Sequence, residues 1–558
     1  MTRRPLAALL WVAVTLTGVI GIAGQLGSTP DPAGASNPQL ISTGSSFAGV
    51  AITQWEGQFN EEYGGDINFT VSSSILGMNA FCQKTVDFGA TDISYATQQS
   101  ICSTSQVPYP FQYMPDVAGG LAFEYNLQAA NGQRVTNLIL NGPTLLGIFT
   151  GSIKNWNNPQ IQALNPNIPM PNQPITAYYR SDASGENYLL SDYFLHVDPG
   201  PITTFQQEAS VPTTPGTPSA TWASFSNGVP QNLNSLEGVN GSDAASQGPA
   251  QNQGGIAYVE YAYAKNVHLP VASVINAAGQ PVQPDSYNVA VALTAAILYS
   301  DLTQNLGGVY TNPNPDAYPI SAYSYFIAQC VPSQAAAQNF ACDSGGPVTM
   351  GSGQGSELSQ FISYVACGGQ SQMASLGYSP IPPNLVEDDF QAAGRLPGGT
   401  SPPPPTPSTC ANPYITGALQ PVGGPTVVGT TNPGSDLTGA GAAVAAVGAA
   451  HATTAVGGST SKGGTGTSTT TAGATSAASA AAAAAQLKKA LNPLNNAQQA
   501  LARQSGLTNA SAGALSKWSP AQVALWSTVF ALVIIGVPLV LWVTTRRRRE
   551  RGSETGAT

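Results

Sequence analysis

The chain has 558 residues, 42% of them hydrophobic and 8% charged, and a formal net charge of −10 at pH 7. Between residues 38 and 400, only six basic residues stand against 24 acidic ones, which gives this region a formal charge of −18. Such a surface repels nucleic acid and anionic lipid, so both are excluded as partners of this region. A bound anion would have to be held locally, by backbone N–H groups, hydroxyls and a single arginine.

The first 27 residues have the layout of a secretory signal peptide. Two arginines are followed by an apolar run and then by small residues. We expect cleavage near the Ala/Gly-rich stretch at 23–36, and an uncleaved signal anchor is the alternative. In either case the remainder of the chain is predicted to be exported.

The region from 38 to about 395 alternates predicted strands and helices. In the first predicted helix, apolar residues recur at i, i+4 spacing until a glycine pair ends the pattern, namely Phe47, Ala51, Trp55 and Phe59. Short β-type runs follow at 66–74 and 86–92, residues 173–180 read as an apolar strand or helix piece, and residues 186–196 read as a helix. This alternation predicts an α/β fold, in which ligands lie where strand ends meet helix N-termini.

Beyond residue 395 the composition changes. A proline-rich linker is followed by an Ala/Gly/Ser/Thr-rich stretch that cannot form a core, so residues 396–519 are predicted to form a stalk. Residues 521–543 are an uncharged run long enough to cross a membrane, and "RRRRER" follows after two threonines. These features predict one transmembrane helix with the tail at 544–558 in the cytoplasm, and the protein body on the extracellular face of the plasma membrane.

The six cysteines of an exported chain are expected to form disulfides. Pairing of nearest neighbours would join Cys82 to Cys102 and Cys330 to Cys342, leaving Cys367 with Cys410. This is one of about 15 possible connectivities. With no CxxC motif and only three histidines, we expect neither a metal site nor a cofactor.

Three loops combine small or hydroxyl residues with a following helix: "GSSF" (44–47), "SSSILG" (72–77) and "RSDASGEN" (180–187). Helix N-termini offer unpaired N–H groups and a partial positive charge, and an arginine adds a bidentate contact to an oxyanion. Each serine taken alone is explained by helix capping. Together the loops point to an oxyanion-binding protein.

At these residues the sequence resembles a known family. The stretches "GSSF", "TVDFGATD", "GSIKNWNNPQIQALNPNIPMPNQPITAYYRSDASG", "GGIAYVEYAYAKNVHLP" and "AYPISAYSYF" are similar, in order and spacing, to the phosphate-binding subunit of phosphate-specific ABC transporters, the PstS type. The resemblance covers about 38–330 and extends toward 395. The stalk, the third cysteine pair and the membrane helix lie outside it.

The resemblance implies a two-lobe fold, a class II Venus-flytrap that closes on one phosphate ion. Lobe 1 would comprise 38–122 and 316–395, and lobe 2 would comprise 123–315. The resemblance further implies no enzymatic activity, and as partners inorganic phosphate and an ABC permease and ATPase complex in the same membrane. Carried over position by position, the implied phosphate ligands are Ser46, Phe47, Ser74, Asp92, Arg180, Ser184, Gly185 and the backbone N–H of Glu186.

Two carboxylates need a separate explanation in a site for an anion. Asp182 matches the residue that braces the ligand arginine. Asp92 matches the aspartate that accepts a proton from bound phosphate, a hydrogen bond that sulfate cannot donate. Ala183 in place of the usual glycine, and Leu76 in place of a small residue, are milder departures from the family.

Glu186 is the main departure, because the family has a threonine there that donates its hydroxyl. Three readings are open. The side chain turns outward and leaves only its N–H on the ligand, which is the reading we favour; or it accepts a second phosphate proton; or the pocket has changed or lost its ligand.

Two other functions compete with phosphate capture. "CDSGGP" (342–347) matches the surroundings of the chymotrypsin-type nucleophile, but neither His196 nor His268 has the context of a catalytic base, and we favour a disulfide-flanked loop. A membrane-tethered sensor or interaction protein that uses the same fold is the second alternative, because the stalk and anchor suit it equally well.

Overall fold

The computed structural model describes residues 37–225, 230–335, 342, 345–420, 422–430 and 432. Among these residues, no helix combines the length and the apolar character needed to span a membrane. The predicted signal peptide (1–27), most of the predicted stalk, the predicted transmembrane helix (521–543) and the tail (544–558) lie outside the described residues.

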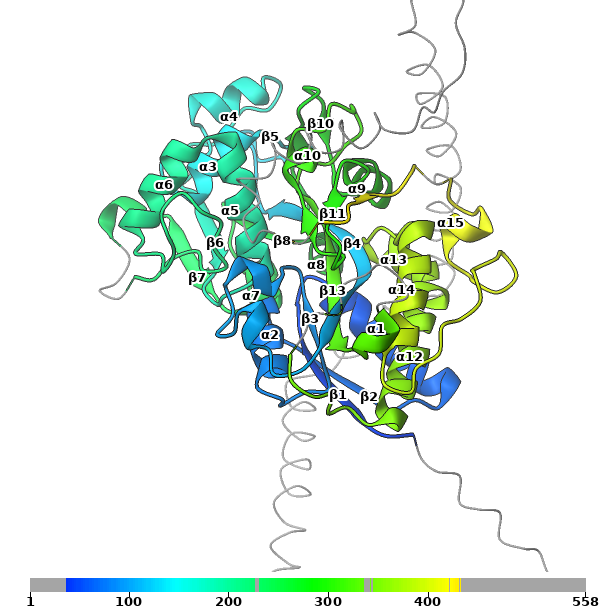
Figure 1. Cartoon of the computed structure of the whole chain (residues 1–558). Helices are drawn as coiled ribbons and strands as arrows, with labels where there is room; N and C mark the ends of the chain where they lie inside the picture. The colour runs from blue at the N-terminus through cyan, green and yellow to red at the C-terminus, as the bar shows by residue number, and fades with distance from the viewer. Residues whose placement is uncertain are drawn as a thin grey trace, which may run out of the picture.

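The centre of the described structure is one eight-stranded mixed sheet, in the order β2-β1-β3-β13-β4-β8-β6-β7 (Figure 1). Its strands are β1 (Leu40–Gly44), β2 (Ile67–Val71), β3 (Phe88–Thr91), β4 (Phe111–Tyr125), β6 (Thr176–Arg180), β7 (Leu236–Val239), β8 (Gly255–Glu260) and β13 (Ser321–Gln329). Two small sheets, β10-β9-β5 and β12-β11-β14, consist of β5 (Ile139–Leu140), β9 (Ser273–Ile275), β10 (Pro281–Val282), β11 (Ile297–Leu298), β12 (Gln304–Asn305) and β14 (Thr426–Val427).

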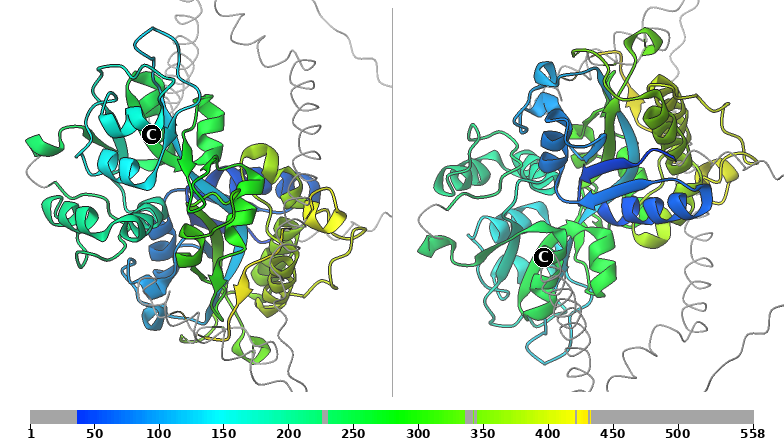
Figure 2. Two further views of the ribbon diagram at one scale, coloured as in Figure 1. Left: turned by 90° about the horizontal axis from the view of Figure 1, so that it is seen from above. Right: turned by 90° about the horizontal axis from the view of Figure 1, so that it is seen from below.

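Helices gather around each end of the sheet (Figures 1 and 2). Around β1–β3 and β13 lie α1 (Gly49–Tyr63), α2 (Ser74–Cys82), α12 (Ser352–Ala366), α13 (Met373–Leu376) and α14 (Pro383–Arg395). Around β6–β8 lie α3 (Gly142–Phe149), α4 (Pro159–Leu164), α5 (Gly185–Val197), α6 (Pro199–Glu208), α7 (Gly241–Gln251) and α8 (Tyr261–Val267). The remaining elements are α9 (Ser286–Leu293), α10 (Gly307–Tyr310), α11 (Pro332–Ala335), α15 (Pro413–Thr416) and the 3₁₀ turns at Tyr95–Thr97, Thr104–Gln106, Gln231–Leu233 and Gly368–Gln372.

The predicted α/β alternation is confirmed. The i, i+4 apolar series forms the buried face of α1, where Ala51, Trp55 and Phe59 are all buried, and Gly64 ends the helix in the left-handed conformation. The indole N–H of Trp55 donates to the carbonyl of Gly369 at 2.8 Å, which satisfies its polar atom inside the core. The helix begins at Gly49, so Phe47 lies in the turn before it.

Two long strands join the two ends of the sheet. β4 pairs antiparallel with β13 over residues 111–120, and then with β8 over residues 121–125. The strand β4 passes from one group of strands to the other. The predicted lobe boundary at 122–123 falls within it. The division into lobes at 122–123 and 315–316 stays a prediction.

Residues 396–432, predicted as the start of the stalk, pack instead on the folded body where the structure describes them. β14 adds a parallel strand to β11, and the Asn432 side chain donates to Thr303 at 2.8 Å and Ser94 at 3.2 Å. Tyr414 and Leu419 are buried in the main core. The proline-rich composition concealed these apolar residues, and they, with a disulfide, hold the segment in place.

The three disulfides connect nearest neighbours in sequence, as predicted. They are Cys82–Cys102, Cys330–Cys342 and Cys367–Cys410, with Cα–Cα distances of 6.6, 6.0 and 4.8 Å. The third joins the end of α12 to the C-terminal segment. It therefore ties residues 411–432 covalently to the body.

Replacing both Cys367 and Cys410 by alanine is expected to lower the free energy of unfolding by about 2–4 kcal/mol, because the bond closes a long loop. The same change should raise the hydrogen exchange rate of the amides of Thr426 and Val428, which donate to Ala296 and Leu298. The matched control is the Cys82, Cys102 double alanine variant, which should leave exchange at 426–428 unchanged. Unaltered exchange in the first variant would contradict the tethering role.

Candidate functional site

The candidate site lies where the carboxyl ends of two groups of parallel strands face each other. β1 pairs in parallel with β2 and β3, and β6 pairs in parallel with β7 and β8. Parallel strands end at a common edge, so the loops that follow them are brought together. The site residues predicted from the sequence lie at the ends of these strands, in the loops after them or in the helix turn that follows: Ser46, Phe47, Ser74 and Asp92 from the first group, and Arg180, Asp182, Ser184, Gly185 and Glu186 from the second.

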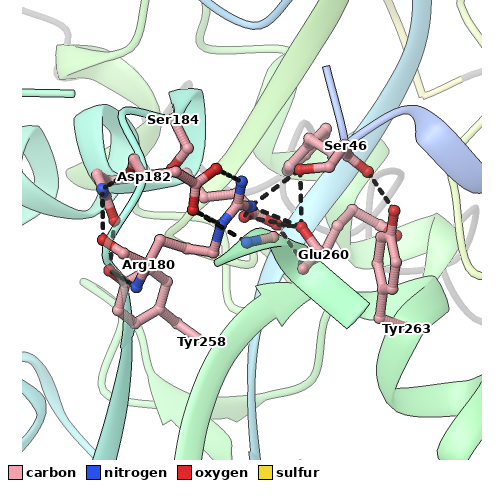
Figure 3. Close-up of polar contacts among 12 residues, drawn as sticks. Ser46, Arg180, Asp182, Ser184, Tyr258, Glu260 and Tyr263 are labelled. Atoms are coloured by element: carbon pink, nitrogen blue, oxygen red, sulfur yellow. Dashed lines mark hydrogen bonds and ion pairs between the residues drawn. The ribbon is translucent and has the colours of Figure 1, made fainter. Parts of the chain in front are cut away.

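Arg180, the last residue of β6, is fully buried at the centre of the site (Figure 3). Its Nε donates to Asp182 Oδ1 at 2.8 Å, and its Nη2 forms an ion pair with the other oxygen of that carboxylate. Its Nη1 lies 2.9 Å from Ser46 Oγ and 2.7 Å from Ser242 Oγ, and forms an ion pair with Glu186. The bidentate contact with Asp182 fixes the plane of the guanidinium and directs Nη1 toward the first group of strands.

The loop between β6 and α5 is held by one amide side chain. Asn187 donates to the carbonyls of Arg180, Asp182 and Ala220 at 2.8–3.0 Å. Ser184 caps the helix, with its Oγ accepting the N–H of Asn187 at 3.2 Å. Gly185 and Glu186 open α5, and the first N–H groups of a helix have no intrahelical acceptor.

At Gly185 the second group of strands closely approaches the first. A Cβ atom at this position would lie 2.3 Å from Asp92 Oδ2 and 2.6 Å from Ser74 Oγ. Any side chain here would push α5 away from β3 and α2, so only glycine allows this approach. The N-terminus of α5 is therefore held directly against Asp92 and Ser74.

Asp92 is fixed as a hydrogen-bond acceptor. Its Oδ1 accepts the hydroxyl of Ser45 at 2.5 Å, and its Oδ2 accepts the hydroxyl of Ser74 at 2.6 Å. Burial raises the pKa of Asp92, and the bonds from Ser45 and Ser74 counteract that rise. Ser74 opens α2, so its Oγ lies at a helix N-terminus.

Ser46 and Phe47 connect β1 to α1 and touch both groups of strands. The hydroxyl of Tyr263, on α8, donates to the carbonyl of Ser46 at 2.7 Å, and that of Tyr378 donates to the carbonyl of Phe47 at 2.6 Å. Both residues are buried. Ser46 is thus held between β1 and α8 with its own hydroxyl directed at Arg180.

The expectation that the Glu186 side chain turns outward is wrong. Its carboxylate is buried and accepts hydrogen bonds from Arg180 Nη1 and from the backbone N–H of Glu260 at 3.1 Å. The Ser242 hydroxyl lies 3.1 and 3.0 Å from its two oxygens. The physical reason is that α5 is buried on all sides from Gly185 to Leu195, so its first turn has no solvent-facing side.

The three carboxylates of the site differ in their surroundings. Burial raises the pKa of Glu186, which the charge of Arg180 counteracts only in part. Burial acts on Asp182 in the same direction, but its hydrogen bonds and charge contact with Arg180 outweigh it and hold its pKa below the usual value. Asp182 is therefore the permanent counter-ion of Arg180, while Glu186 is the carboxylate more readily protonated.

Sequence reasoning missed two groups that complete the site. Ser242, in the first turn of α7, contacts Ser46 at 2.8 Å as well as Arg180 and Glu186. It follows β7 within "NGSDAA", the same combination of small and hydroxyl residues that marked the other loops, so this signal was present. The backbone N–H of Glu260 had no sequence signal, because only the end of β8 places it there.

The histidines weighed for a protease have other contacts. His196 lies in the last turn of α5, with Nδ1 2.9 Å from the carbonyl of Asp192. His268 ends α8 in the left-handed conformation. Ser344 of "CDSGGP" lies outside the described residues. In the described part of the chain, both histidines make their contacts at the ends of helices.

Comparisons with known proteins show what this chain is similar to. A family model described as a PBP superfamily domain matches residues 29–367, more than half of the chain. The phosphate-binding protein PstS 3 of Mycobacterium tuberculosis (strain ATCC 25618 / H37Rv) is 28% identical over 389 residues, covering 68% of this chain and 90% of that protein. The phosphate-binding protein PstS of Xylella fastidiosa (strain Temecula1 / ATCC 700964) is also 28% identical over 389 residues, covering 68% and 94%. A solved phosphate-binding protein from Stenotrophomonas maltophilia aligns at 18% identity with a TM-score of 0.44, over 70% of this chain and 100% of that one.

Arg180→Ala is expected to destabilise the fold by about 3–5 kcal/mol at pH 8, because it leaves the buried Glu186 carboxylate without its cation. Without Arg180 the folded-state pKa of Glu186 rises further. The loss of unfolding free energy relative to the wild type should therefore grow as the pH rises through that pKa, and should be smaller at pH 5. Chemical denaturation at both pH values measures this.

The matched control is the double variant Arg180→Ala, Glu186→Ala, which removes both charges and should recover most of the lost stability. An equal loss of stability in the single and double variants would contradict the assigned ion pair.

Proposed function

The chain belongs to the PBP superfamily, as a PstS-type substrate-binding protein, and on that premise we propose that it captures inorganic phosphate between two lobes and delivers it to an ABC importer. It acts as a binding protein and not as an enzyme. The matched relatives named as phosphate-binding proteins support phosphate as the ligand.

The observation that carries this proposal is the placement of one buried cation opposite a fixed acceptor. Arg180 comes from one group of parallel strands, and Asp92 from the other. Hydroxyls of Ser46 and Ser74 and the N-terminus of α5 lie between them. Such a set offers donors to phosphate oxygens and one acceptor to a phosphate proton.

The Asp92 carboxylate gives the site a means of choosing phosphate over sulfate. Phosphate near neutral pH still carries a proton that it can donate, whereas sulfate at that pH carries none. In a buried site, an ion without a proton faces an unpaired carboxylate, which costs binding free energy. Because Ser45 and Ser74 hold both Asp92 oxygens in place, the acceptor cannot turn away from the wrong ion.

We propose the ligand set Ser46, Phe47, Ser74, Asp92, Arg180, Ser184, Gly185 and the N–H of Glu186, with Asp182 as the residue that orients Arg180. The added Ser242 hydroxyl belongs to the same site. The three loops that open α1, α2 and α5 supply most of these groups.

We also propose that the protein is anchored in the membrane by its C-terminal region. The uncharged run at 521–543 and the arginines that follow it support a single membrane span with a cytoplasmic tail. The Ala/Gly/Ser/Thr-rich stretch before it would act as a tether with a reach on the order of 60 Å. Such a tether would keep the binding domain near an importer in the same membrane, on the extracellular face.

The test is equilibrium binding of radiolabelled phosphate to the full-length protein, with sulfate as competitor. Saturable phosphate binding that sulfate displaces poorly is the expected result. An absence of saturable binding at millimolar phosphate, both with the Glu186 carboxylate and after its removal, would overturn the proposed function.

Asp92→Asn is expected to reduce the preference for phosphate over sulfate about tenfold or more, because an amide can donate to either ion where the carboxylate only accepts. Competition binding measures the ratio of the two affinities. The control is Asp66→Asn on the exposed surface, which should leave the ratio unchanged. A ratio that does not move in Asp92→Asn would refute the role assigned to that carboxylate.

A further inference from the structure

The Glu186 carboxylate occupies donors that a bound anion would need. Its two oxygens accept from a guanidinium N–H of Arg180, from the Ser242 hydroxyl, and from the backbone N–H of Glu260. A carboxylate with a cation and two neutral donors around it has the same set of partners as a bound oxyanion. In this structure, therefore, the chain supplies its own anion to the site.

The fixed arrangement of Arg180 leaves few other donors for a ligand. Asp182 takes Nε and one hydrogen of Nη2. Nη1 is shared among Glu186, Ser46 and Ser242. A phosphate that approaches Ser46 from the side of Asp92 meets a guanidinium whose Nη1 already contacts Glu186, Ser46 and Ser242.

The charges around Arg180 also indicate that phosphate and the Glu186 carboxylate compete for it. One buried cation, Arg180, is surrounded by two carboxylates in direct contact, Asp182 and Glu186, and a third, Asp92, lies within the site. Adding a phosphate dianion while Glu186 stays charged and in place would put like charges together in a buried space. The ligand and the Glu186 carboxylate therefore exclude each other at Arg180.

We propose that Glu186 is a tethered competitor of phosphate, a specificity- and affinity-determining residue whose carboxylate must give up Arg180 and Ser242 before the ligand can bind. This inference rests on the proposed function. Because Glu186 is attached to the first turn of α5, its effective concentration at Arg180 is high and independent of the solution. The site would then fill only at phosphate concentrations well above those needed by the same site without the carboxylate.

The experiment compares phosphate binding by the full-length wild-type protein, Glu186→Thr and Glu186→Gln, using isothermal titration calorimetry with inorganic phosphate at pH 8. Threonine removes the charge and leaves a donor hydroxyl, while glutamine keeps the shape of glutamate without its charge. We expect both variants to bind phosphate more tightly than the wild type, by about tenfold or more, since a charge-assisted contact no longer has to be broken. The matched control is Glu61→Gln, an exposed glutamate on α1, which should bind like the wild type.

Each outcome has a separate meaning. Equal affinities in the wild type and both variants would overturn the competitor role and leave the proposed function intact. Weaker binding in both variants would also overturn it, because Glu186 would then be a required acceptor for a phosphate proton. A failure of all proteins to bind millimolar phosphate would overturn the proposed function itself, and this inference with it.

A second measurement separates competition from an indirect structural effect. Burial raises the pKa of Glu186, so the residue takes up a proton as the pH falls and loses its hold on Arg180. The ratio of the Glu186→Thr affinity to the wild-type affinity should therefore shrink between pH 8 and pH 5.5. A ratio that stays constant over this range would overturn the proposal.

Other groups around Glu186 titrate or carry charge in both proteins, so their effects largely cancel in the ratio. From β6 and the loop after it, the loop after β3, and from β4, β8 and α8, they are Arg180, Asp182, Asp92, Glu124, Tyr258, Glu260 and Tyr263. Burial raises the pKa of Glu124 to about 8, and the Ser246 hydrogen bond opposes that rise. The titration of phosphate itself likewise acts on both proteins.

Discussion

The structure of the site depends on one buried cation. Arg180 is one of only six basic residues between positions 38 and 400, and its side chain is fully buried. Taking a guanidinium out of water is costly unless carboxylates and hydrogen-bond acceptors surround it. The acceptors that surround the guanidinium are Asp182, Glu186, Ser46 and Ser242. Their contacts with Arg180 bring β1, β6 and α7 together at one point.

The sheet makes this convergence possible. β4 and β13 run through its centre and join two groups of parallel strands whose carboxyl ends face each other. β1, β2, β6 and β7 are each followed by small or hydroxyl residues and a helix, so hydroxyls and helix N-termini accumulate in one place. Gly185 then allows α5 to reach Asp92 with no side chain between them. An anion site in an otherwise acidic protein is feasible because these donors act over short distances.

The two inward carboxylates have different consequences. Asp92 is anchored by two serines and lies opposite Arg180, where it can accept a proton from the ligand. Glu186 contacts Arg180 itself, and so takes the role that an anion would have. In the proposed function, Asp92 selects among anions and Glu186 sets how readily any anion enters. The C-terminal segment at 411–432, tied by Cys367–Cys410, adds β14 to the small sheet beside β11 and extends the folded body beyond the family-like region.

The sequence by itself determined the α/β alternation, the first helix with its buried Trp55, the disulfide partners, and the set of loops that form the site. Apolar spacing and capping residues act within a few turns of the chain, the cysteines pair with their nearest neighbours in sequence, and the family resemblance added which residues belong together. The side-chain direction of Glu186 could not be predicted, because it depends on whether α5 has a solvent-facing side, and that is decided by the helices and strands packed around it. Likewise, Ser242 and the N–H of Glu260 reach Arg180 only through the pairing of β6 with β7 and β8. Tertiary packing alone decided that an inward carboxylate stands at the arginine.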